Sequence, residues 1–135
     1  TAAWTLLVTA RLGLALARVT WPRLLAGGVV ICDRYVLDSW VELAHRYGSE
    51  RSFGVQIRLL RLLTPEPELA YVLDVPPEIA SERKLDYSTE DNRERAALYR
   101  EYREALGVDM LDGTLPRSEL VTAIAPAIAA ALRRD

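Results

Sequence analysis

The stretch "VVICDRYVLDSW", residues 29–40, decides the fold expected of this chain. It begins with four apolar residues and runs without a break into Asp33, Arg34 and Tyr35. A strand that is apolar at every position must be covered on both faces, which is typical of a parallel strand between two layers of helices. Residues 29–32 therefore predict a buried parallel strand that ends at an acid and a base.

Length and composition are compatible with one core. The chain has 135 residues, of which 50% are hydrophobic, so we expect a single domain over residues 1–135. Its formal net charge is only −2, from 17 basic and 19 acidic residues, so neither nucleic acid nor a membrane surface is an expected partner. The single cysteine, Cys32, cannot form an intramolecular disulfide, which favours a reducing, cytoplasmic location.

The first part of the chain is strongly apolar over residues 4–17, but Arg11 interrupts this run and Arg18 closes it. A membrane span needs about 20 largely uncharged residues, and a signal peptide carries its positive charge before its apolar centre. The segment instead predicts a buried helix over residues 4–26, ended by the glycines at 27–28. Because they are seven positions apart, the two arginines are expected on one helical face.

Hydrophobic periodicity and helix-stop signals divide the rest of the chain. Helices are expected at about residues 36–47, 55–63, 77–84, 89–106 and 120–132, and strands at 69–75 and 108–112. This alternation predicts an α/β fold with a parallel sheet sandwiched between helices. All three expected strands end in aspartate, at Asp33, Asp74 and Asp112. Ligands of such sheets gather at the carboxyl ends of the strands, although ordinary turn or cap residues are the favoured interpretation of Asp74 and Asp112.

The order of these motifs resembles the thymidylate kinase family of P-loop nucleotide kinases. In that family a helix carrying an arginine leads through a glycine to an apolar strand ending in "DRY", as in "ARLGLALARVTWPRLLAGGVVICDRYVLDS", residues 10–39. The segment "PELAYVLDVPPEIASER", residues 67–83, is similar to a later family signature. The resemblance covers almost the whole chain, but each motif is short, and only their order and spacing are specific. It implies a P-loop kinase-like fold. It also implies an enzyme that transfers the γ-phosphoryl group of ATP to a nucleoside monophosphate, with dTMP as one candidate acceptor.

The resemblance assigns roles to the charged residues around "DRY". Asp33 would help to hold hydrated Mg²⁺ beside the phosphates, and Arg34 would hold the acceptor phosphate. Arg11 would reach the same phosphate from the preceding helix, with Arg18 as a competitor for that role. Phosphoryl transfer needs this set because charge on the transferring oxygens must be neutralised by cations and arginine side chains.

Further substrate-binding positions follow from the same resemblance. Tyr35, Ser39 and Tyr99 match positions that lie near the acceptor nucleotide. Glu42 stands where the family usually has an aromatic side chain that lies against the base or sugar. A carboxylate cannot make that stacking contact, so another phosphorylated acceptor stays open.

The donor nucleotide is assigned to the second half of the chain. Arg83 matches the position that packs on the adenine of ATP, with Lys84 beside it as a cofactor-binding residue. The family's mobile lid corresponds to residues 84–95 and would bring Arg93 and Arg95 to the reacting phosphate as catalytic side chains.

One departure from the family is large: the sequence contains no G-x-x-x-x-G-K-[ST] motif to hold the donor phosphates. We therefore expect the chain to be the C-terminal part of a longer kinase-like protein. Two alternatives stay open, namely a non-catalytic module that binds nucleotides or a protein, and a P-loop kinase with another small-molecule acceptor. The apolar helices at the front could also form a homodimer face.

Overall fold

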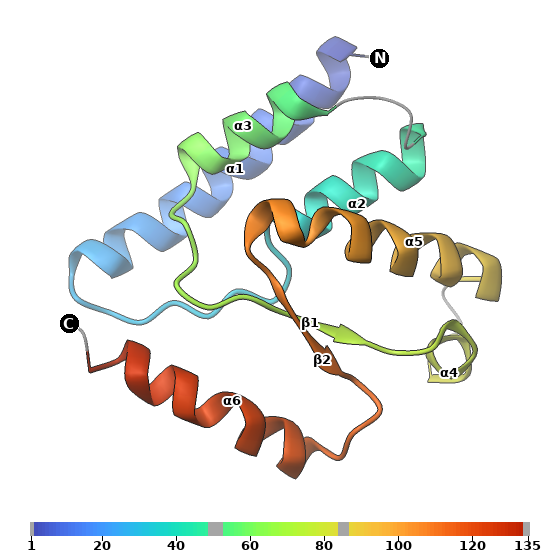
Figure 1. The fold of residues 1–135 in the computed structure, drawn as a ribbon. Coiled ribbons are helices and arrows are strands. Elements are labelled where there is room, and N and C mark those ends of the chain that lie inside the picture. The colour runs from blue at the N-terminus through green and yellow to red at the C-terminus, as the bar shows by residue number, and fades with distance from the viewer. Residues whose placement is uncertain (1, 49–52, 84–86, 134–135) are drawn as a thin grey trace. The chain divides into compact units, whose positions relative to one another are not determined.

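The computed structural model describes residues 2–48, 53–83 and 87–133, and it separates into two compact units, Thr1–Glu66 and Pro67–Asp135 (Figure 1). The single domain expected over residues 1–135 stays a prediction. The structure is 68% helical, with two short strands in the described ranges. The predicted parallel sheet sandwiched between helices, and with it the P-loop kinase-like fold, is therefore wrong.

The expected strand at residues 29–32 accounts for much of this error. This segment forms no strand in the structure, and its apolar side chains are open to solvent, with Val29 67% and Ile31 93% exposed. A parallel strand exists only through backbone hydrogen bonds to a neighbour, and no segment in the described ranges pairs with this one. The apolar run alone was not sufficient to produce a strand.

In its described residues, the first unit contains the helices α1 (Ala2–Leu25), α2 (Val36–Tyr47) and α3 (Gly54–Leu63). Figure 1 shows α1 and α3 side by side along their length. The core of the unit is formed mainly by α2 and α3, where Val41 and Leu60 are completely buried. The predicted helices at 36–47 and 55–63 are confirmed to within one residue.

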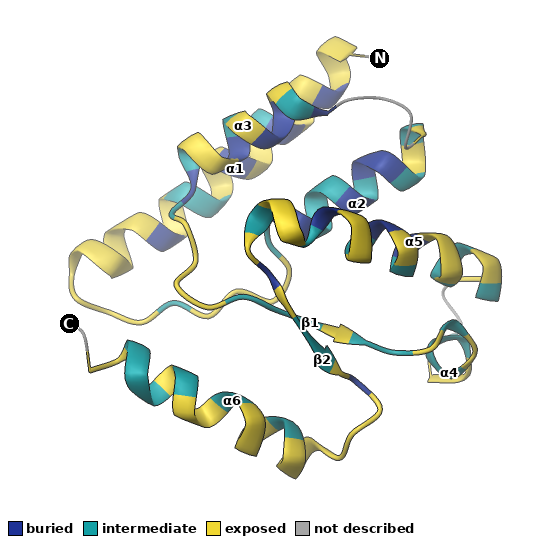
Figure 2. Cartoon of the chain, in the orientation of Figure 1, coloured by how far each residue is buried: buried dark blue, intermediate teal, exposed yellow. Residues whose placement is uncertain are grey.

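Helix α1 differs from the buried helix expected there. Its buried residues are small, namely Thr5, Thr9, Gly13 and Thr20, whereas most of its large apolar side chains are exposed (Figure 2). Within the described ranges, α1 is the helix whose length and apolar composition would allow it to cross a membrane. Signal sequences and the core helices of soluble proteins can have the same length and composition.

The end of α1 is a Schellman motif, which confirms the predicted stop. Gly27 has a positive φ of 74° and donates to the carbonyl of Leu24, while Gly28 donates to the carbonyl of Arg23. Glycine suits this position because the left-handed conformation costs it no steric clash with a Cβ atom.

The second unit contains a parallel pair of strands, β1 (Tyr71–Asp74) and β2 (Asp109–Asp112). Between them lie α4 (Pro77–Arg83), α5 (Thr89–Tyr102) and the short 3₁₀ helix η1 (Glu104–Leu106), and α6 (Arg117–Ala131) follows. The two strands and the helices of this unit lie close to the predicted ranges. The expected helix at 89–106 is divided, since α5 ends at Tyr102.

The start of α5 shows why its sequence specifies a helix boundary. The Asp91 amide donates to the Ser88 hydroxyl, and the Ser88 amide donates back to the Asp91 carboxylate at 3.2 Å. Both hydrogen bonds satisfy amides that have no partner inside the helix.

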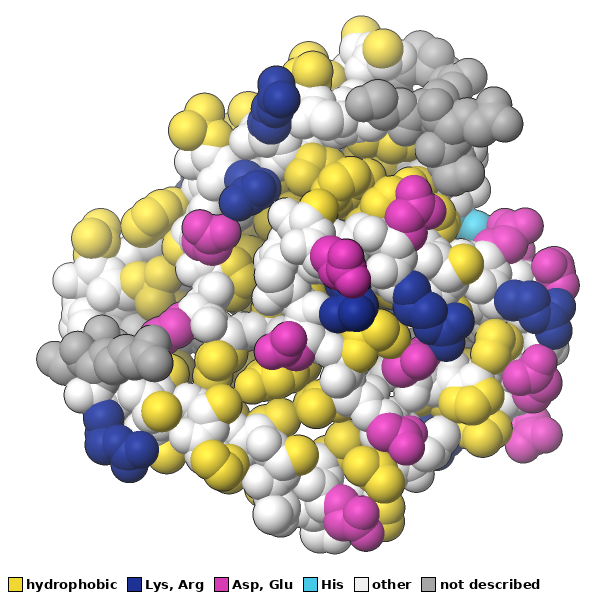
Figure 3. All heavy atoms as spheres, viewed as in Figure 1, with side chains coloured by type: hydrophobic (Ala, Val, Ile, Leu, Met, Phe, Trp, Pro, Cys, Tyr) yellow, Lys and Arg dark blue, Asp and Glu magenta, His cyan; other side chains and the backbone are white. Residues whose placement is uncertain are grey.

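Hydrophobic side chains reach the surface of both units in the view of Figure 3.

Candidate functional site

The junction between the apolar segment and α2 carries the two charges that the sequence singled out. Asp33 and Arg34 are both exposed, and neither forms a hydrogen bond or ion pair through its side chain with another residue in the described ranges. Arg34 has a φ of 68°, in the left-handed region. For a residue with a Cβ atom this conformation costs about 1–2 kcal/mol, and such strain is concentrated at functional sites.

Tyr35 anchors this junction to the rest of the unit. Its backbone amide donates to the Asp38 carboxylate at 2.8 Å, and its hydroxyl donates to the carbonyl of Pro65 at 2.7 Å. Burial raises the pKa of the Tyr35 hydroxyl, with a smaller opposing effect from a hydrogen bond to Thr64, so the hydroxyl stays protonated and can donate at neutral pH. The strained Arg34 therefore directly precedes a fixed residue.

The other substrate-binding candidates of the first unit have different surroundings. The Ser39 hydroxyl donates to the carbonyl of Tyr35, the N-cap residue of its helix, at 3.2 Å. The Glu42 carboxylate pairs with Arg46 at 3.2 Å on the surface of α2. Arg11 and Arg18 are exposed on α1, as expected from their spacing, and form no ion pair with a residue in the described ranges. Among the described residues neither arginine contacts Arg34, so their shared phosphate site stays a prediction.

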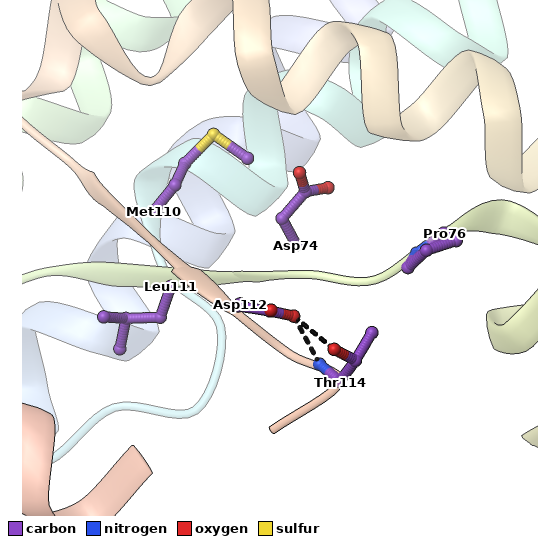
Figure 4. A pocket seen from close by; sticks show the side chains of 6 residues that line it. All are labelled: Asp74, Pro76, Met110, Leu111, Asp112 and Thr114. Atoms are coloured by element: carbon purple, nitrogen blue, oxygen red, sulfur yellow. Dashed lines mark hydrogen bonds between the residues drawn. The ribbon is translucent and has the colours of Figure 1, made fainter. Parts of the chain in front are cut away.

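The carboxyl ends of β1 and β2 form a second candidate site, within the second unit. Asp74 and Asp112 are direct partners in the parallel register, at the last position of each strand. They line an open pocket of about 410 Å³, together with Pro76, Met110, Leu111 and Thr114 (Figure 4). This is the edge of a parallel sheet at which ligands commonly bind.

The two carboxylates of this pocket are held differently. The Asp112 carboxylate accepts hydrogen bonds from the hydroxyl of Thr114 at 2.6 Å and from its backbone amide at 2.9 Å, drawn as dashed lines in Figure 4. These bonds favour the ionised form, the side-chain bond most, and lower the pKa of Asp112. Both oxygens of Asp74 accept from a guanidinium nitrogen of Arg100, at 2.9 and 3.0 Å. Asp74 is therefore paired with a cation, whereas Asp112 is held by the uncharged Thr114.

Gly113, directly after β2, lies very close to the residues at the end of β1. A Cβ atom at this position would lie 2.5 Å from Cγ2 of Val75 and 3.2 Å from the carbonyl oxygen of Asp74. The Gly113 amide donates to that carbonyl at 2.8 Å. The close approach leaves no space for a side chain, so glycine is required.

The predicted donor-site and lid residues are engaged in contacts inside the second unit. Arg83 donates to the carbonyl of Gly113 at 3.1 Å. Arg93 pairs with Glu90 and, at 3.2 Å, with Glu78. A backbone hydrogen bond and then the bond from Arg93 lower the pKa of Glu78. These ion pairs are exposed to solvent, which screens the attraction between their charges.

Two further residues of the predicted lid and its following helix are packed more tightly. The Arg95 guanidinium lies 4.7 Å from the ring centre of Tyr87, and the residue is buried. Tyr99 lies on α5 with intermediate exposure. Lys84, the remaining donor-site candidate, lies outside the described residues.

Sequence reasoning missed Thr114 and Arg100 as parts of the strand-end pocket. The segment Asp112–Gly113–Thr114 does carry a usable signal, because an aspartate side chain often accepts from the backbone amide two residues later. Arg100 carries no comparable signal, since its contact with Asp74 depends on the position of α5 beside β1.

A magnesium site was tested against the side chains present. The described ranges contain no group of three or more His, Cys, Asp or Glu residues arranged to hold a metal ion. Mg²⁺ commonly keeps several waters and is bound by one or two carboxylates together with substrate phosphates. The exposed carboxylate of Asp33 fits that limited role.

Comparisons with known proteins found no family model, no curated protein and no solved structure that matches this chain.

Proposed function

We propose that this chain forms the acceptor side of a nucleotide kinase-like phosphotransferase, which moves the γ-phosphoryl group of ATP to a nucleoside monophosphate such as dTMP. The observation that carries the proposal is the conformation of Arg34. An exposed arginine without an ion-pair partner in the described ranges occupies a strained backbone position beside Asp33 and directly before the anchored Tyr35. The order of the sequence motifs adds support.

Arg34 is suited to bind the acceptor phosphate. Its guanidinium can donate two parallel hydrogen bonds to phosphate oxygens, an interaction worth about 1.5–3 kcal/mol. Helix α2 begins at Val36, and the amides of a first helical turn favour negative charge nearby. The Asp38 carboxylate already accepts from the amide at this helix start, so Arg34 is the source of positive charge at the junction.

Asp33 has the complementary role in the proposal. Its carboxylate would help to hold the hydrated Mg²⁺ that accompanies ATP, and the metal would neutralise charge on the transferring phosphoryl group. Arg93 and Arg95 remain candidates for a contribution from the lid, and Arg83 and Lys84 for contacts with ATP.

The test measures acceptor binding and phosphoryl transfer separately. Binding of dTMP and other nucleoside monophosphates to this chain is followed by calorimetry, and ADP formation from ATP is assayed with the full-length protein and the same panel. Arg34→Ala is expected to weaken monophosphate binding about tenfold or more, which corresponds to the loss of one charge-assisted contact. Arg58→Ala, which removes an exposed arginine from α3, serves as the matched control.

Three results would contradict the proposal. Monophosphate binding unaffected by Arg34→Ala would remove this residue from the site. ADP formation with nucleosides but with no monophosphate would identify a different acceptor class. Binding of monophosphates without any ADP formation would favour a nucleotide-binding module without catalysis, which the lack of a G-x-x-x-x-G-K-[ST] motif in these 135 residues also favours.

A further inference from the structure

The exposed face of α1 carries a regular pattern that its contact with α3 does not use. The helix packs on α3 through small residues, and a Cβ atom at Gly13 would lie 2.7 Å from Cδ1 of Leu63. Close to its start, Thr5 accepts a buried hydrogen bond from Gln56 at 3.0 Å. Small residues at this contact allow the two helices to approach closely, and most large apolar side chains of α1 are exposed. Trp21 is partly engaged there, since its indole nitrogen donates to the carbonyl of Leu63 at 2.8 Å.

Seven exposed residues of α1 follow an alternating spacing of three and four positions. We call them the α1 seam: Trp4, Leu7, Arg11, Leu14, Arg18, Trp21 and Leu25. The five apolar members are between 42% exposed, at Trp21, and 82% exposed, at Leu25. Spacing of this kind places all seven side chains on one stripe of the helix and is the pattern by which one helix packs against another in a coiled coil. The seam is thus shaped for a partner helix.

The charges of the seam select the kind of partner. Arg11 and Arg18 occupy its central positions, about 10.5 Å apart along the axis, and α1 contains no acidic residue. In an antiparallel pair of identical seams both arginines would face apolar seam residues and lack an acidic partner, and in a parallel pair each arginine would face its own copy. Like charges in such contacts are strongly unfavourable, which argues against a homodimer through this face.

A lipid surface is also a poor match for the seam. An interfacial helix separates its charged face from its apolar face, whereas here the two arginines lie within the apolar stripe. Burial of these charges in hydrocarbon would be costly. A protein helix with carboxylates at the facing positions would instead pair both charges.

We propose that the α1 seam docks an amphipathic helix of a protein partner, whose apolar stripe carries two Asp or Glu residues seven positions apart, opposite Arg11 and Arg18. This inference goes beyond the proposed function and assigns the two arginines to partner binding. It is independent of the role of Arg34, which lies outside the seam.

The test uses two designed helical peptides of four heptads as probes, added to the full chain and followed by fluorescence anisotropy. Both carry apolar residues along the seam, with Glu in one and Lys in the other at the two positions that face Arg11 and Arg18. The Glu peptide is expected to bind at least tenfold more tightly than the Lys peptide. The double variant Arg11→Glu/Arg18→Glu is expected to reverse this preference, which also shows that the variant is folded.

Arg23→Glu provides the matched control. Arg23 is an exposed arginine of the same helix outside the seam, so the preference for the Glu peptide is expected to stay unchanged. Equal binding of both peptides, or binding of neither, would overturn the proposal. So would self-association of the chain that the double variant abolishes, or binding to anionic phospholipid vesicles in place of the peptides. If the double variant loses monophosphate binding and its peptide preference is not reversed, Arg11 and Arg18 belong to the substrate site and the proposal is wrong.

Discussion

Gln56 on α3 donates a hydrogen bond from Nε2 to Oγ1 of Thr5 on α1, over 3.0 Å, in a buried contact between residues far apart in the sequence. The bond joins the two helices at a place where neither polar group has access to water. Polar side chains in such contacts fix how two helices are aligned, because an unsatisfied buried polar group costs about 1–3 kcal/mol.

Replacement of this glutamine is expected to destabilise the protein. Gln56→Ala removes the hydrogen bond and part of the packing, and we expect a loss of about 1–3 kcal/mol in the free energy of unfolding, measured with urea. Val55→Ala is the control at the neighbouring position, where the side chain is 65% exposed, with an expected loss below about 0.5 kcal/mol. Equal losses in the two variants would show that the Gln56 bond contributes nothing.

A larger side chain at Gly13 is expected to separate α1 from α3. The position faces Leu63 so closely that Gly13→Leu must displace the helices, which we expect to cost about 1–3 kcal/mol. Ala15→Leu introduces the same side chain at an exposed position of α1 and should leave stability nearly unchanged. Thermal unfolding followed by circular dichroism compares them, and a similar midpoint for both would contradict the close contact.

The backbone strain at Arg34 predicts a difference between two substitutions that both remove its charge. Arg34→Gly releases the left-handed conformation from the clash with Cβ, while Arg34→Ala retains it. The glycine variant is therefore expected to be about 1 kcal/mol more stable than the alanine variant in urea unfolding. Both should bind nucleoside monophosphates equally weakly, whereas a more stable alanine variant would argue against a strained position.

The pKa of Asp112 gives a prediction on pH dependence. Because hydrogen bonds from Thr114 hold this pKa below its ordinary value of 3.8, ionised Asp112 stabilises the folded state above that value. The contribution is lost as the pH falls through the folded pKa. Thr114→Val removes the hydroxyl donor and should raise the pKa of Asp112 toward its ordinary value, measured by NMR titration of the carboxyl group. Thr122→Val, in α6, should leave it unchanged, and an unaltered pKa in Thr114→Val would exclude the hydroxyl as the cause.

Local signals predicted much of the second unit. The capping pair of Ser88 and Asp91 marks the start of α5, and the apolar runs before Asp74 and Asp112 became strands in parallel register. These features depend on neighbours in the sequence or on a short pairing between similar strands. The division of the expected helix at 89–106 was not foreseen, because Gly107 gives no sign of the 3₁₀ turn that precedes it.

The failures in the first unit have a common physical cause. An apolar run such as residues 29–32 indicates which side chains avoid water, but a strand requires a partner that the run itself cannot specify. The density of apolar residues in α1 likewise predicted burial, although the helix buries its small residues and exposes its large ones. Periodicity identified the helix, and only packing could show which face it buries.

The strand-end site was predicted in part. The acids at 74 and 112 were recognised as strand-end residues, and the register now places them opposite each other. The contacts from Thr114 and Arg100 depend on tertiary structure and on a turn that was not considered. The site around Asp33 and Arg34 was predicted from residue type, but the strained conformation of Arg34 has no signal in its sequence.

The pair formed by β1 and β2 leaves one row of backbone amides and carbonyls without a strand neighbour on each outer side, among the residues that the structure describes. Such rows can template the addition of strands from other molecules, which is the first step of ordered aggregation. Each strand here contains only four residues, and Pro76 soon follows β1 and cannot donate to a ladder. Their shortness leaves only a few backbone groups on each edge for a strand of another molecule to pair with.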